Sequence, residues 1–112
     1  MKQSKEFLLH KEIAVETVGN GVTRQIFGYN SQILLAKITF EKGSIGDVHQ
    51  HPHVQTSYIE SGKFEVMINN SKQILEKGDG FFVPGDTDHG VVCLEAGVII
   101  DTFTPAREDF LK

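Results

Sequence analysis

The chain has 112 residues and carries 11 basic against 15 acidic side chains, which gives a formal net charge of −4. A length of this order predicts one domain, and the acidic balance argues against nucleic acid as a partner because it leaves no basic patch for a phosphate backbone. The chain shows neither a signal-peptide core nor an apolar run near the roughly 18 residues of a membrane span. Together with a single cysteine, which cannot form an internal disulfide, these features predict a cytoplasmic protein that does not insert into a membrane.

The composition favours strands, because β-branched residues outnumber Leu and Ala by more than two to one. In chain order, alternating apolar and polar residues predict strands over residues 13–18, 22–29, 33–41, 55–60, 63–68, 72–75, 81–83, 89–94 and 98–104. Asn20 and Gly21 predict a hairpin turn between the first two strands. Turns at Ser61 and Gly62 and at residues 95–97 are predicted to separate two later pairs. This spacing is typical of an all-β sandwich or barrel.

Helix is predicted only near the two ends of the chain. Residues 3–11 have room for one or two turns, and Thr104 followed by Pro105 reads as the N-cap and first residue of a short helix. We therefore expect one domain over residues 1–112, in which residues 105–112 form a short C-terminal helix or tail.

Three of the five histidines lie within five residues of one another. Side chains two positions apart on a strand point to the same side, so His49 and His51 can present two imidazoles to one point. Gln55 has the parity to return to that side, and His89 lies on a later strand that can face them. Three imidazoles and an amide oxygen would make a site for a divalent transition metal with one or two positions left open.

The same residues resemble the two sequence motifs of the cupin family. The first motif is matched in every spacing by Gly43, His49, His51, Gln55 and Gly62, with Gln where the usual pattern has Glu. The second is matched by Gly78, Pro84 and His89, whereas Asp86 stands in place of a Gly and Cys93 in place of an Asn. The resemblance implies a double-stranded β-helix, the jelly-roll barrel of the cupins, with one divalent metal ion per chain.

Residues near the C-terminus resemble a narrower group, the pectin-degradation cupins of the KdgF type. Asp101, Phe103 and Arg107 match positions that line the pocket beside the metal in that group. The resemblance implies an enzyme that opens the ring of 4,5-unsaturated uronate monosaccharides from pectin or alginate breakdown, giving the open-chain keto acid. Its metal ligands would be His49, His51 and Gln55 of the first motif and His89 of the second.

The resemblance also implies a homodimer, since small cupins usually pair. The N-terminal segment 1–15, which includes the apolar residues 7–9, offers a strand that can pair with the sheet of a partner subunit.

Several of these residues have a second interpretation. Asp101 shares a face with Phe103, and that face is either an exposed sheet edge or the wall of a polar cavity. Taken alone, Arg107 reads as a solvated charge near the chain end. The side chain of His53 has the strand parity to point to the same side as His49 and His51, but Pro52 disturbs the strand. We therefore expect His53 to lie beside the metal ligands or at the pocket rim, and favour this over a role as a ligand.

The expected ligand set leaves the +2 charge of the metal uncompensated, because three imidazoles and an amide are all neutral. Such a centre attracts anions and acts as a Lewis acid, but it supports a +3 oxidation state less well. We expect a small anionic sugar as substrate, with Arg107 binding its carboxylate, Asp101 moving a proton and Phe103 shaping the wall. A metal-dependent dioxygenase and a non-catalytic sugar-binding cupin are the alternatives. Nickel, zinc, iron and manganese all suit these ligands.

Overall fold

The computed structural model describes residues 3–111, and nearly all of their regular structure is β. In chain order the elements are η1 (His10–Glu12), β1 (Glu16–Gly19), β2 (Val22–Tyr29), β3 (Leu34–Phe40), β4 (Ile45–His49), β5 (Val54–Ile68), β6 (Ser71–Glu76), β7 (Gly80–Val83), β8 (His89–Thr104) and η2 (Glu108–Leu111), where η marks a 3₁₀ helix. The all-β prediction is confirmed. Residues 1–2 of the predicted N-terminal segment and residue 112 of the predicted tail lie outside the described residues. Within the described part of the chain, no helix is long and apolar enough to cross a membrane.

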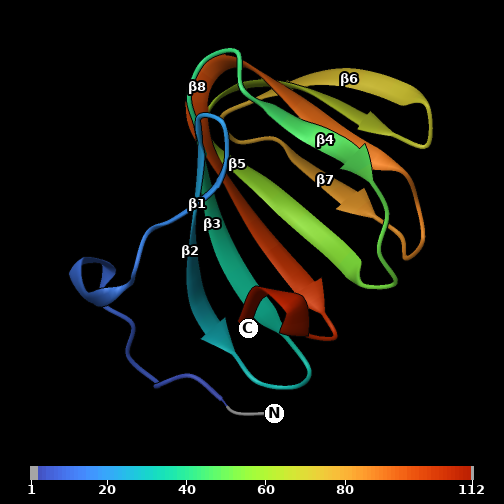
Figure 1. The fold of residues 1–112 in the computed structure, drawn as a ribbon. Helices are drawn as coiled ribbons and strands as arrows, with labels where there is room; N and C mark the ends of the chain where they lie inside the picture. Colours follow the sequence, from blue (N-terminus) through green and yellow to red (C-terminus); the bar gives the residue numbers. More distant parts are fainter. Residues whose placement is uncertain (1–2, 112) are drawn as a thin grey trace.

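The strands form a jelly roll in which β5 and β8 belong to both of its layers (Figure 1). Residues 97–103 of β8 pair with β3, while residues 89–92 pair with β4 on the opposite layer. The strand β5 likewise pairs with β7 through residues 55–58 and with β6 through residues 63–68. One layer therefore has the order β1-β2-β3-β8-β5-β7 and the other the order β4-β8-β5-β6, and all the pairs are antiparallel.

Two turns predicted from the sequence are in fact bends within long strands. The residues Ser61 and Gly62 do not end a strand, because β5 runs through them with shifts of register against β8. Residues 95–97 lie inside β8 in the same way. A Cβ atom on Gly62 would lie 2.6 Å from the Cα of Gly97, so the two bends meet at one corner where both strands cross from one layer to the other.

The chain ends also differ in detail from the prediction. Thr104 is the last residue of β8 rather than a helix cap, and the C-terminal helix begins only at Glu108. At the other end, η1 is a single turn at His10–Glu12. The first strand starts at Glu16 and pairs with β2 of the same chain.

The apolar core lies between the two layers and extends from Phe40 and Phe64 to Phe103. Along β3, every second residue is apolar and buried, and the residues between them are less buried, as the alternation over residues 33–41 predicts. Phe40 and Phe64 meet edge to face with ring centroids 5.1 Å apart, and Cys93 is buried beside them, as expected for a small apolar side chain. Near the histidines, the buried polar side chains of Gln55 and Ser57 share these inner faces with Phe103.

Candidate metal centre and cavity

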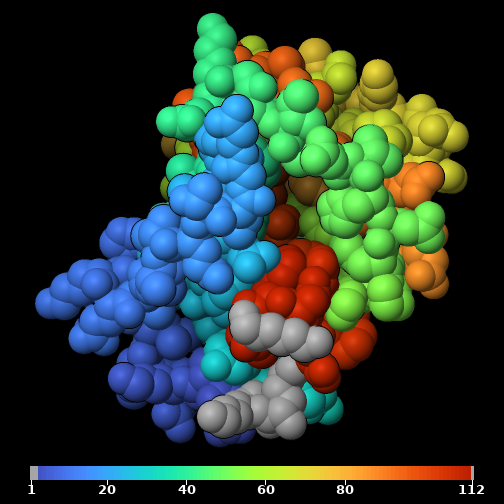
Figure 2. Space-filling model, in the orientation of Figure 1, coloured from blue at the N-terminus to red at the C-terminus, as the bar shows by residue number. Residues whose placement is uncertain are grey.

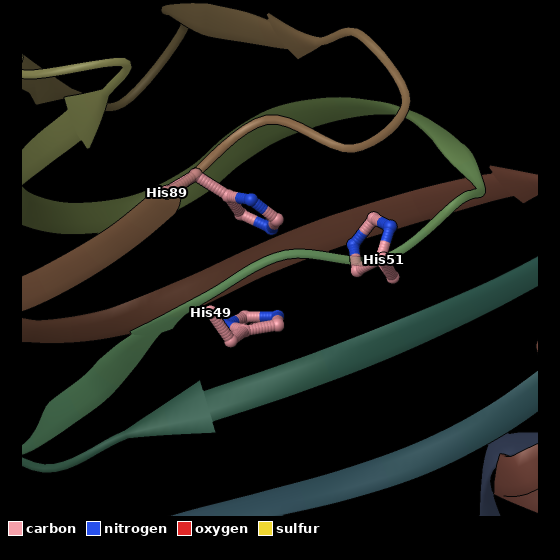
Figure 3. A group of neighbouring side chains, drawn as sticks. All are labelled: His49, His51 and His89. Carbon is pink, nitrogen blue, oxygen red and sulfur yellow. The ribbon is translucent and has the colours of Figure 1, made fainter.

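The structure brings together the three histidines that the sequence singled out (Figure 3). His49 ends β4, His89 begins β8, and the two residues are direct partners in the antiparallel register. His51 follows in the loop before β5. One ring nitrogen from each of the three histidines lies within 4.8 Å of those of the others, which suits three ligands of one ion.

Hydrogen bonds to the main chain fix which nitrogen each ring presents. The Nδ1 atoms of His49, His51 and His89 lie 2.8, 2.9 and 2.8 Å from the carbonyl oxygens of Asp47, His53 and Thr87. A neutral imidazole that donates from Nδ1 leaves the lone pair of Nε2 free to bind a metal. In His89 the Nε2 atom is buried and has no hydrogen-bond partner within residues 3–111.

Gln55, near the start of β5, completes the cluster through its side-chain oxygen. Its Nε2 atom donates to Ser57 Oγ at 3.0 Å and to Asp101 Oδ1 at 3.2 Å, which turns Oε1 toward His51 Nε2 at 3.1 Å. Burial and, next, the charge of Arg107 lower the pKa of His51, so its ring is neutral at physiological pH. With the proton on Nδ1, two lone pairs then face each other, an arrangement that a cation between them would relieve.

These residues therefore fit a divalent metal. Burial also lowers the pKa of His89, which keeps that ring in the neutral form needed for ligation. The histidines and Gln55 oxygen would hold the ion, and a neutral ligand set of this kind suits zinc, nickel, iron or manganese.

Asp101 faces the interior, and not an exposed sheet edge. It lies on β8 directly opposite Ser57 of β5, whose Oγ donates to Asp101 Oδ1 at 2.6 Å. Burial raises the pKa of Asp101 to about 6, although the hydrogen bonds from Ser57 and Gln55 oppose that shift. The carboxyl group thus titrates close to neutral pH, and both of these hydrogen bonds end on Oδ1.

Phe103 and Arg107 also lie beside the histidines. Phe103 is opposite Gln55 in the register, and its ring centroid lies 5.7 Å from that of His51. The Arg107 guanidinium stacks 5.0 Å from the centroid of Phe103 and is not a solvated charge, since its side chain is only 11% exposed. Its Nε and Nη2 atoms bind the two carboxylate oxygens of Asp109, at 3.0 and 2.8 Å.

His53 lies next to the histidine cluster, but its ring is not one of the three that converge. Its main-chain carbonyl orients His51, and its ring centroid lies 5.5 Å from that of His51. Together with Arg107 and Asp109, it lines a second, smaller cavity near the C-terminal segment. This position matches the expected place beside the ligands.

The sequence-based interpretation missed Ser57 and Asp109, which contact Asp101 and Arg107. Ser57 has the same strand parity as Gln55, and that parity was the available signal. Nothing in the sequence pointed to Asp109, because its ion pair with Arg107 becomes visible only in the folded C-terminal segment.

A cavity of about 730 Å³ opens in front of the cluster, within the size range of small-molecule sites. Figure 2 shows the molecule hollowed between the green residues around β4 and the red C-terminal residues. The cavity is lined by residues of the β1–β2 turn, β2, β3, β4, β8 and the tail, among them Arg24, His49, Gln55, His89, Asp101, Phe103, Arg107 and Phe110.

A jelly roll that holds three converging imidazoles and an amide oxygen at one end defines a cupin. The family model described as "Cupin domain" matches residues 36–103, more than half of the chain, so the chain belongs to the cupin family.

Within the cupins, the resemblance to the KdgF group is confirmed. The chain is 39% identical over 109 residues to "Pectin degradation protein KdgF" of Dickeya dadantii (strain 3937), covering 96% of this chain and 99% of that protein. The solved structure of KdgF from Halomonas sp. is 34% identical with a TM-score of 0.90 and covers 96% of this chain and 99% of its own. A crystal structure of an RmlC-like cupin from Shewanella frigidimarina NCIMB 400 is 45% identical with a TM-score of 0.95, over 98% and 99% of the two chains.

Proposed function

We propose that the chain is a metal-dependent enzyme that opens the ring of 4,5-unsaturated uronate monosaccharides and releases the open-chain keto acid. The observation that carries the proposal is Asp101, a carboxyl group with a raised pKa that contacts the candidate ligand Gln55 and faces a sugar-sized cavity. The similarity to a protein named for pectin degradation supports a sugar acid as the substrate. Alginate is a second source of sugar acids with the same chemistry.

The proposed reaction moves protons and neither adds nor removes atoms. The anomeric hydroxyl loses its proton as the bond between the anomeric carbon and the ring oxygen breaks. The ring oxygen leaves with the electrons of that bond as an enolate, which becomes the ketone when the neighbouring carbon of the former double bond takes up a proton. A group that ionises near neutral pH can accept the first proton and deliver the second.

Asp101 meets this requirement. Its pKa of about 6 allows both protonation states near neutral pH. Ser57 and Gln55 both donate to Oδ1, so Oδ2 is the oxygen left to exchange a proton with the sugar. A divalent ion bound by the histidines and Gln55 would supply Lewis acidity toward a substrate oxygen.

The other two predicted residues shape and charge the cavity. Phe103 is nearly fully buried and forms part of its wall. Arg107 contributes a positive charge that favours an anionic sugar, but Asp109 already binds its Nε and Nη2 atoms, so no adjacent pair of its nitrogens is free for a bidentate carboxylate contact. Its Nη1 remains for the ligand.

The test is incubation of the metal-loaded protein with unsaturated galacturonate, following the loss of the absorbance of its conjugated double bond. We expect Asp101→Asn to lower kcat about 100-fold or more while the metal still binds, because only the proton-transfer group is lost. Asp79→Asn is the matched control, since Asp79 lies on the β6–β7 turn and does not line the cavity.

Three outcomes would contradict the proposal. A wild-type rate equal to that of buffer would remove the ring-opening activity, and binding of uronates without turnover would then favour a sugar-binding cupin. Oxygen uptake with iron, and no turnover with nickel or zinc, would favour a dioxygenase. An Asp101→Asn enzyme as fast as the wild type would remove the proposed role of this carboxyl group.

A further inference from the structure

Arg24 and Arg107 are the only two arginines in the chain, and both line the same cavity. Arg24 lies on the inner face of β2, where it is the register partner of Ile38 in β3. Ile38 in turn pairs with Ile99 of β8, and Asp101 is the next inward-facing residue on that strand. The Arg24 side chain thus projects from the same inner surface as the proposed proton-transfer group, one row of side chains away.

Both guanidiniums also stack on one ring. The Cζ atom of Arg24 lies 3.9 Å from the centroid of Phe110, and that of Arg107 lies 4.2 Å from the same centroid. The Arg24 side chain is only 15% exposed, which is unusual for a charge without a bidentate partner. Phe110 therefore holds two covered positive charges beside one cavity.

The two arginines differ in the donors that they still have free. Arg107 uses Nε and Nη2 on Asp109. Arg24 makes a single contact, from Nε to Glu16 Oε1 at 3.3 Å, and its Nη1 and Nη2 atoms make no other hydrogen bond within residues 3–111. A carboxylate is bound most tightly by two adjacent N–H donors of one guanidinium, and Arg24 is the arginine that still offers such a pair.

We propose that Arg24 is a substrate-binding residue whose Nη1 and Nη2 atoms hold the carboxylate of the sugar acid, with Arg107, stacked on the same Phe110 ring, adding charge. This inference deepens the proposed function, on which it rests for the reacting sugar. The ligand class it names, a monosaccharide carboxylate, can be tested without turnover.

The first experiment measures binding by calorimetry with saturated galacturonate and with galactose, which lacks the carboxylate. We expect Arg24→Gln to weaken galacturonate binding about tenfold or more, the range expected for a lost charge-assisted hydrogen bond, and to leave any galactose binding unchanged. Arg24→Lys keeps the charge without the planar pair of donors, so its affinity for galacturonate should fall between those of the wild type and Arg24→Gln. Lys63→Gln is the matched control, since Lys63 pairs with Glu95 outside the cavity.

A second experiment separates binding from a purely structural role. We expect Arg24→Gln to raise KM for the unsaturated uronate about tenfold, with kcat within about twofold of the wild type, because a contact made equally in ground and transition states changes only KM. Glu16→Gln removes the ion pair but keeps Arg24, so it should not reproduce the effect. Thermal unfolding of each variant shows whether the fold is retained.

Unchanged galacturonate affinity in a folded Arg24→Gln or Arg24→Lys protein would overturn the inference. So would an equal loss in Glu16→Gln, or no galacturonate binding by the wild type. If galacturonate binding depends on Arg24 but the wild type has no ring-opening activity, the proposed function is wrong and the inference about Arg24 still holds.

Discussion

At the scale of single residues, the histidine cluster is organised by main-chain carbonyls two residues from each ring. His49 and His89 donate to carbonyls before them in the chain, and His51 donates to one after it. Because these acceptors belong to the backbone, the tautomers depend on the path of the loops more than on neighbouring side chains. Gln55 differs, since its orientation comes from the side chains of Ser57 and Asp101. The proton-transfer group and one candidate ligand are thus joined in one hydrogen-bonded network.

The ion pair between Asp109 and Arg107 predicts a dependence of stability on pH. The hydrogen bonds from Arg107 hold the pKa of Asp109 below its usual value. A carboxyl group whose pKa is lowered by folding contributes stability above its unfolded pKa, near 4, and loses it as the pH falls through the lower folded value. We therefore expect Asp109→Asn to lower the unfolding temperature at pH 7 and to converge with the wild type in acid. A gap that stays constant from pH 7 to pH 3 would contradict this, and Glu108→Gln removes a neighbouring carboxylate as the control.

At the scale of elements, the corner between the two layers depends on two glycines that touch. Gly62 has a φ of +84°, and a Cβ atom on it would lie 2.6 to 2.7 Å from backbone atoms of residues 95–97. These atoms belong to the opposite strand and cannot move without bending it. The corner that allows β5 and β8 to serve both layers therefore requires residues without side chains.

Substituting these glycines separates backbone strain from steric conflict. Gly78 has a φ of +95° but nothing within 4 Å of its Cβ position, so Gly78→Ala should cost only the left-handed strain of about 1–2 kcal/mol. Gly62→Ala adds the clash and should cost roughly 3 kcal/mol or more. Urea unfolding of both variants measures the difference. Equal costs at the two positions would show that the corner can relax around a methyl group.

The same corner shows what the sequence alone could predict. Ser61 and Gly62 are a genuine turn signal, but whether a turn signal ends a strand or bends it depends on contacts with a strand more than thirty residues away. The four candidate ligands could be predicted because His49, His51 and Gln55 are close in sequence and His89 matches a known motif. Asp109 and Arg24 could not, because their partners are set by how the tail packs on β2 and β8.

At the scale of the whole molecule, the candidate metal centre connects parts of the chain that the apolar core does not. The core is formed by residues of β2, β3, β5, β8 and the tail, whereas the four candidate ligands lie on β4, on the loop after it, on β5 and on β8. The strand β4 contributes no residue to that core. An ion bound by these ligands would link β4 to β5 and β8.

Metal binding should therefore raise the unfolding temperature. An ion that binds only the folded chain adds about 2.7 kcal/mol at a free concentration 100 times its Kd, which corresponds to an increase on the order of 10 °C for a domain of this size. We expect this increase with at least one of zinc, nickel, iron and manganese, and its reversal by a chelator. His89→Gln removes one ligand whose Nε2 is buried without a partner, so that variant should show little of the increase, whereas His10→Gln, outside the cluster, should keep it. An equal increase in His89→Gln, or none with any of the four metals, would contradict the assignment of these histidines as ligands, because stabilisation by a specific site must depend on the atoms that form it.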